Sequence, residues 1–118
     1  MKHLKTVWKT LLIYFFVLAL LLVCVTCSAQ VTAMQFNASW NAQNGVEWFN
    51  KLADCDTESH MIDGNDMQKK YKIAVVPTII IFDDGEEVKR FQADLSFKMQ
   101  ATRKEIQDYI DELIISKF

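Results

Sequence analysis

The sequence predicts one small α/β domain with a mixed sheet, preceded by an apolar N-terminal segment. The run "PTIIIF" at 77–82 is bounded by an acidic turn, and an uninterrupted apolar run of this kind is typical of a central strand buried on both faces. Residues 102–114 have the start signal and the apolar stripe of an amphipathic helix. A strand–helix–strand pattern precedes both, which favours a parallel pair of strands beside the central one.

The first 29 residues differ from the rest of the chain and predict export. Three lysines among the first nine residues precede an uncharged run at 11–25, and small residues lie just before Gln30. This pattern is that of a secretory signal peptide, with cleavage expected after Ala29 and a domain at 30–118. The alternative is an N-terminal membrane anchor, because 10–30 is close to the roughly 20 apolar residues that a spanning helix needs. Both interpretations place the domain in the periplasm or cell envelope.

The charge and cysteine content of the expected domain exclude some functions. All 15 acidic residues follow residue 30, but only 10 of the 13 basic residues do, so its net charge is 10 minus 15, or −5. An acidic domain without a basic patch has no electrostatic footprint for nucleic acid. Cys55 is the one cysteine after residue 30, so no internal disulfide is possible. The CxxC-spaced pair Cys24 and Cys27 is interpreted as part of the apolar leader.

The first half of the domain has four predicted elements. Residues 31–36 have the β-branched and aromatic content of a strand. Apolar residues at helical spacing predict a helix over 44–54. Residues 55–63 are consistent with a second strand that ends in the turn "DGND". Residues 66–73 predict one or two helical turns.

The second half has clearer signals. The strand at 77–82 is expected to form a hairpin with 86–92, joined by a turn at Asp84 and Gly85. Thr102 and Glu105 form a capping box that begins the last helix. Its apolar stripe follows at i, i+3, i+4, i+7 and i+8, and consists of Ile106, Tyr109, Ile110, Leu113 and Ile114.

Two stretches at the joints of these elements, "FNASW" and "YKIAVVPTIIIFDDGEEVKRF", resemble the thioredoxin family. The resemblance implies a thioredoxin-like sandwich, a central mixed sheet flanked by helices, which lacks the family's first strand and helix. It also implies that Pro77 is cis after Val76 and faces the redox site. In the family an apolar groove here receives an extended peptide, so Trp40, Val76 and Pro77 are the candidate groove residues.

The resemblance also indicates what is missing. The family has Cys-Gly-Pro-Cys where this chain has Asn41-Ala42-Gln43-Asn44, and Gln35 stands where the family keeps a buried aspartate. Dithiol exchange needs a thiolate to attack and a second thiol to resolve the mixed disulfide. We therefore expect no catalytic residues, no cofactor and no thioredoxin-type enzyme activity. Asn41 is predicted to act as a helix N-cap instead, because asparagine is among the best N-cap residues.

Three functions remain open at this point. The first is binding of a polypeptide or a thiol-redox partner, with a membrane involved only if the N-terminal segment is retained. The second is thiol chemistry by Cys55 as a single thiol, and the third is a purely structural role in the envelope. The acidic stretch 54–66 lacks the spacing of a calcium-binding EF-hand and the ligand set of a zinc site, so no metal is predicted.

Overall fold

The computed structural model describes residues 6–17 and 30–118. Residues 6–17 form a helix, and within the described residues no helix is both long and apolar enough to cross a membrane. The rest of the predicted leader, including Cys24 and Cys27, lies outside the described residues.

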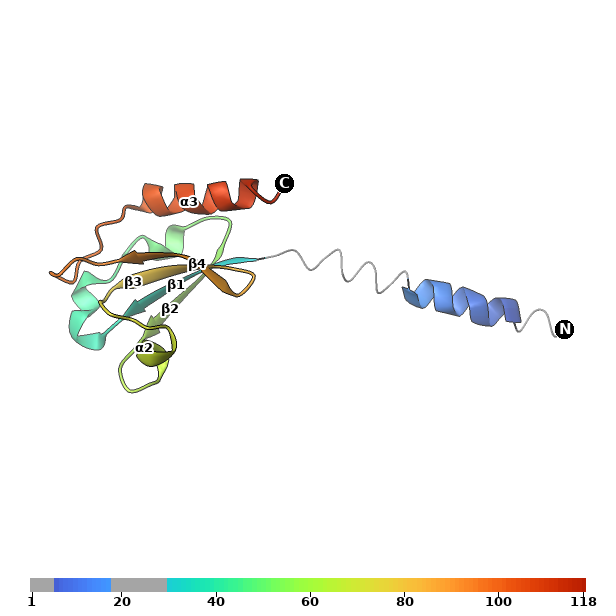
Figure 1. Ribbon diagram of the computed structural model, residues 1–118, viewed down its shortest axis with the longest axis horizontal. Coiled ribbons are helices and arrows are strands. Elements are labelled where there is room, and N and C mark those ends of the chain that lie inside the picture. Colours follow the sequence, from blue (N-terminus) through green and yellow to red (C-terminus); the bar gives the residue numbers. More distant parts are fainter. Residues whose placement is uncertain (1–5, 18–29) are drawn as a thin grey trace.

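The domain is built on a four-stranded mixed sheet (Figure 1). Its strands are β1 (Val31–Asn37), β2 (Asp56–Met61), β3 (Thr78–Asp83) and β4 (Glu86–Gln92), in the order β2-β1-β3-β4. β1 pairs with β2 in parallel, whereas the β1–β3 and β3–β4 pairs are antiparallel. The predicted mixed sheet and all four strands are thus confirmed.

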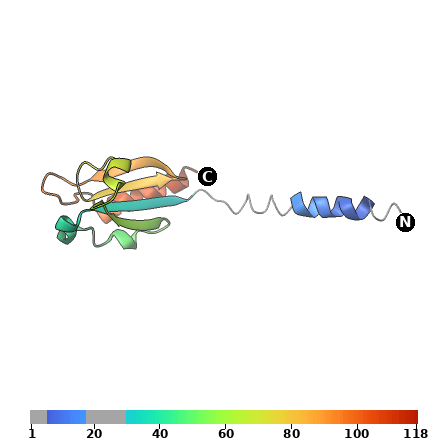
Figure 2. The same ribbon diagram turned by 90° about the horizontal axis from the view of Figure 1, so that it is seen from below.

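Helices cover the two faces of the sheet, α3 (Arg103–Ile115) on one side and α2 (Met67–Lys70) on the other (Figures 1 and 2). On the α3 face, Ile79 and Ile81 pack with the buried side chains of the helix. On the α2 face, Ile80 packs in a second apolar cluster with Phe36 and Phe82. β3 is therefore buried on both faces, as its apolar run predicts.

The hairpin and the last helix also follow their sequence signals. Asp84 and Gly85 both have positive φ, 53° and 85°, which is the geometry of a tight two-residue hairpin turn. Thr102 begins α3, and its hydroxyl accepts a hydrogen bond from the Glu105 N–H at 3.2 Å. Ile106 and Ile110 of the predicted stripe are fully buried.

The predicted helix over 44–54 is wrong. The segment between β1 and β2 contains only the 3-10 helices η1 (Ser39–Asn44) and η2 (Phe49–Lys51). Because the two strands are parallel, the chain must travel back from Asn37 to the level of Thr32, about 17 Å at 3.3 Å per residue. The ten residues between η1 and Cys55 would rise only about 15 Å as an α-helix, which leaves no residues for the turns at its ends.

Candidate functional site

The Trp40 groove is a cavity of about 330 Å³ at the end of β1. Trp40 on η1 is 60% exposed, and its indole meets the Phe97 ring edge-to-face with the ring centroids 5.0 Å apart. Val76, which is buried, forms part of the wall. Ala38, directly after β1, and Phe97, in the loop before α3, also line the cavity. The other lining residues come from the segment after β2, from α2 and from the segment before β3: Ile62, Asp63, Gly64, Asn65, Gln68, Ile73, Ala74 and Val75.

The structure brings two of the three predicted groove residues together. Trp40 and Val76 both line the cavity, although they are far apart in the sequence. Pro77 lies beneath the surface with a fully buried side chain and does not line the cavity. The Val76–Pro77 peptide bond is cis.

Asn41 does not cap a helix, so its predicted role is wrong. The N-cap position of η1 is Ala38, and no side chain caps that end. Asn41 is instead the third residue of η1 and is buried, with 2% of its surface exposed. The physical reason is that the chain turns into η1 directly after β1, so that the N-cap position falls on Ala38 and the Asn41 side chain is directed into the fold.

The buried Asn41 side chain links three segments. Its Nδ2 lies 3.2 Å from the Asn37 Oδ1, 3.3 Å from the Val76 carbonyl oxygen and 3.1 Å from the Phe97 carbonyl oxygen. These acceptors belong to β1, to the segment before β3 and to the loop before α3. Asn37 reinforces the first link, because its Nδ2 donates to the Asn41 carbonyl oxygen at 3.1 Å. A single carboxamide thus holds the groove walls to the sheet.

Asn44 and Gln35 extend the same arrangement. The Asn44 Nδ2 donates to the Asn41 Oδ1 at 2.8 Å. Gln35 on β1 is buried; its Oε1 accepts from the Val46 N–H at 2.8 Å, and its Nε2 donates to the Ser59 hydroxyl at 3.3 Å. Side-chain carboxamides do not ionise near neutral pH, so Gln35, Asn41 and Asn44 provide neither a nucleophile nor a proton acceptor for thiol exchange.

Cys55 lies at the other end of β1 from the groove. It precedes β2, whose Asp56 is level with Thr32 near the start of β1, whereas η1 follows the end of β1. The thiol is half-buried beside a cavity of about 390 Å³. Burial raises the pKa of the Cys55 thiol, and the negative charges of Asp56 and Asp54 raise it further. A thiol in this setting is mostly protonated near neutral pH and is a poor nucleophile.

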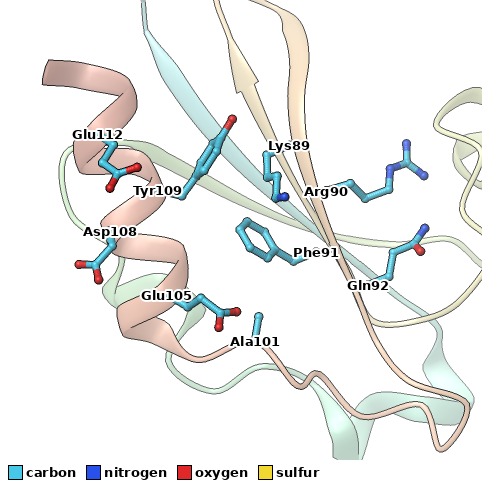
Figure 3. Close-up of a pocket in the computed structure, with 9 residues that line it drawn as sticks. All are labelled: Lys89, Arg90, Phe91, Gln92, Ala101, Glu105, Asp108, Tyr109 and Glu112. Atoms are coloured by element: carbon cyan, nitrogen blue, oxygen red, sulfur yellow. The ribbon is translucent and has the colours of Figure 1, made fainter. Parts of the chain in front are cut away.

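A larger cavity, of about 610 Å³, lies between β4 and α3 (Figure 3). Phe91 of β4 and Tyr109 of α3 meet there edge-to-face, with centroids 6.1 Å apart. The residues around it include acids of α3 together with Lys89, and none is a predicted site residue. Within the part of the chain that the structure describes, no three His, Cys, Asp or Glu side chains are grouped so that they could hold a metal ion.

Sequence reasoning missed two residues of the site. Phe97 supplies both a ring beside Trp40 and a carbonyl oxygen for Asn41, and its φ is 63°. The one aromatic residue in the loop "ADLSFKMQ" was the available signal. Asn37 is buried at the end of β1, where a polar residue after an apolar strand indicates a specific hydrogen-bonding role.

Comparison with known proteins establishes the fold. No family model matches the chain, and no curated protein matches its sequence. Among solved structures, a mutant thioredoxin from Halobacterium salinarum is similar with a TM-score of 0.56 and 24% identity, over 75% of this chain and 78% of that one. Thioredoxin from Schistosoma mansoni is similar with a TM-score of 0.57 and 20% identity, over 80% and 86% of the two chains. Fasciola hepatica thioredoxin has a TM-score of 0.51 and 20% identity, over 70% and 80%.

The class of fold follows from these similarities together with the sheet order. This chain has a thioredoxin-like α/β fold, reduced to four strands. Identities below 25% support the fold alone, so activity and partners rest on the site itself.

Proposed function

We propose that this chain is an exported thioredoxin-like protein without dithiol chemistry that binds an extended polypeptide in the Trp40 groove. The observation that carries the proposal is the exposed indole of Trp40 at a cavity of about 330 Å³, beside a buried network made of carboxamides. A large aromatic side chain left exposed at a concave surface is the kind of residue that dominates binding energy in protein interfaces.

The backbone before β3 supports an extended ligand. Among the described residues, no acceptor is found for the Val76 N–H. The Val76 carbonyl oxygen receives the Asn41 Nδ2 at 3.3 Å, which leaves its second lone pair available. A peptide strand beside this segment would pair with both groups, as in other cases of strand addition.

The groove lining indicates the chemistry of the ligand. Asp63 is the one charged residue among the twelve that line it, and its Oδ2 accepts from the Ser39 N–H at 2.7 Å. An apolar segment, with a basic residue only where it passes Asp63, would suit this lining. The single-thiol alternative is less favoured for two reasons. The raised pKa of the Cys55 thiol makes it a poor nucleophile, and Cys55 lies at the opposite end of β1 from the groove.

The test is binding of a peptide selected from a displayed library by the full chain. Trp40→Ala and Val76→Asp should weaken that peptide by about 30-fold, because loss of an interface hot spot costs about 2 kcal/mol. Phe118→Ala is the matched control, since Phe118 is a fully exposed aromatic residue outside the groove. Equal affinity for all four proteins, or failure to select any peptide, would contradict the proposal.

A further inference from the structure

The free edge of β2 carries this inference. Among residues 6–17 and 30–118, the sheet order leaves β2 as an outer strand, paired with β1 on one side only (Figure 1). Glu58, Ser59 and Met61 of this strand are exposed, and Thr57 and His60 are partly exposed. A strand edge of this kind presents unpaired N–H and C=O groups that can pair with another chain.

The hydrogen bond at the end of β2 fixes which backbone groups face outward. The Ile62 N–H donates to the Asn37 carbonyl oxygen, so Ile62 is directed toward β1. Because backbone direction alternates along a strand, Thr57, Ser59 and Met61 direct their N–H and C=O groups away from the sheet. The Met61 carbonyl agrees with this assignment, since it accepts from the Asn65 Nδ2 at 2.7 Å outside the sheet.

We propose that two copies of this chain pair through their β2 strands, antiparallel, about a two-fold axis that passes between their Ser59 residues. In this register the two Ser59 residues exchange a pair of backbone hydrogen bonds. Each Met61 N–H reaches the Thr57 carbonyl oxygen of the other copy. The pairing ends at Met61, where Asn65 already occupies the carbonyl oxygen.

Charge selects this register over its neighbours. Outward residues must oppose outward residues, so the neighbouring registers place Thr57 opposite Ser59 or Ser59 opposite Met61. The first sets the carboxylate of Glu58 directly against that of its own copy, which is destabilising because the charges are alike. The second sets the two His60 rings against each other and leaves each Glu58 without a His60 opposite it. In the proposed register each Glu58 is opposite a His60, an N–H donor for its carboxylate.

The two side chains are already suited to this contact. Glu58 and His60 lie on one face of β2, where the Glu58 Oε2 and the His60 Nε2 are 3.3 Å apart. The His60 ring stacks on Phe36 with the centroids 5.7 Å apart, which holds it in place. Five residues a side bury less than the roughly 1,600 Å² of a standard interface, so we expect a weak dimer that needs trapping to be seen.

A disulfide across the axis tests the pairing in the full chain. Ser59→Cys is made in a background with Cys24→Ala, Cys27→Ala and Cys55→Ala, and is exposed to a mild oxidant. The two Ser59 Cα atoms would be about 5.5 Å apart, within the range for a disulfide. Thr57→Cys in the same background is the matched control, because its two copies would be about 14 Å apart along the strands.

Disulfide-linked dimer from Ser59→Cys, and its absence from Thr57→Cys, is the expected result. No dimer from Ser59→Cys, or equal amounts from both variants, would overturn the proposal.

The charge order is tested in the Ser59→Cys background, where Glu58→Lys should remove most of the dimer and the further change His60→Glu should restore it. A dimer yield that neither change alters would overturn the register.

Discussion

At the scale of single residues, Asn41 shows how one buried side chain can hold a groove in shape. A cysteine at this position would offer one weak donor, whereas the two N–H groups of the carboxamide lie within hydrogen-bond distance of acceptors on three segments, and its Oδ1 accepts from Asn44. The groove walls formed by Val76 and Phe97 are therefore held by Asn41 itself. Asn41 is thus a structural residue, whereas the exposed Trp40 is the residue through which the proposed binding would act.

Asn41→Ala should destabilise the domain by about 1–3 kcal/mol, because it leaves buried carbonyl oxygens without their donor. Urea denaturation followed by circular dichroism measures the difference. Asn50→Ala is the control, since Asn50 is an exposed asparagine on η2 and should change stability little. Equal stability of both variants would show that the three contacts of Asn41 contribute little.

The double substitution Asn41→Cys with Asn44→Cys should introduce dithiothreitol-dependent reduction of insulin. The two side chains are in direct contact, with 2.8 Å between the Asn44 Nδ2 and the Asn41 Oδ1, so two thiols at these positions would be close enough to exchange. The unmodified chain should be inactive in the same assay. Activity of the unmodified chain that is lost in Cys55→Ser would instead support single-thiol chemistry.

Cys55 should react slowly with a thiol reagent near neutral pH, and its rate should rise as the pH increases. Burial and the charges of Asp56 and Asp54 raise the pKa of the thiol, so the thiolate fraction at a given pH is lower than for a free cysteine. Asp56→Asn removes one of these charges, lowers the pKa and should accelerate labelling. Asp66→Asn, in the turn after the other end of β2, is the control and should leave the pH–rate profile unchanged.

At the scale of elements, local signals decided what the sequence could predict. The central run of β3, the Asp84–Gly85 turn and the Thr102 cap each act within a few residues, and all three have their predicted structures. The segment after η1 had a helical pattern but not enough residues to cross the sheet as a helix. Its conformation depends on the distance between two strand ends, which no local pattern contains.

The same distinction applies to the site. Trp40 and Val76 were predicted through the resemblance to thioredoxin, and both line the groove. The link between Asn41 and Phe97 joins residues 56 positions apart, through a side chain and a backbone carbonyl. Almost any residue could supply that carbonyl, so no sequence signal marks the contact, and the N-cap role predicted for Asn41 was wrong.

Thr102→Ala should cost about 1 kcal/mol, because the hydroxyl that satisfies the first turn of α3 is lost. The Glu105 N–H at 3.2 Å would lose its acceptor. Thermal or urea denaturation of the variant gives the value, and Thr102→Ser, which keeps the hydroxyl, should be close to the unmodified protein. A Thr102→Ser variant as unstable as Thr102→Ala would show that the methyl group, rather than the cap, is responsible.

At the scale of the whole molecule, a small sheet depends on both of its covering layers. A domain of about 90 residues buries a modest share of its surface, so its stability margin is small. Arg90 contributes to one layer from β4, since its guanidinium donates to the Tyr71 and Lys72 carbonyl oxygens after α2, at 2.7 and 2.9 Å. It thereby satisfies the end of a helix only four residues long.

The contacts at the start of this domain are compatible with cleavage of the leader after Ala29. The Gln30 carbonyl oxygen accepts from the Asp84 N–H at 3.0 Å, next to the start of β1. Every strand pair that the structure describes lies between Val31 and Gln92, after the expected cleavage point. Intact-mass measurement of the protein from its host should therefore find 30–118 outside the membrane fraction.

Ala29→Leu should block cleavage, because the peptidase needs a small residue there, and should hold the full chain in the membrane. If the unmodified chain keeps its leader and behaves in the same way as this variant, the N-terminal segment is an anchor and the Trp40 groove acts at a membrane surface.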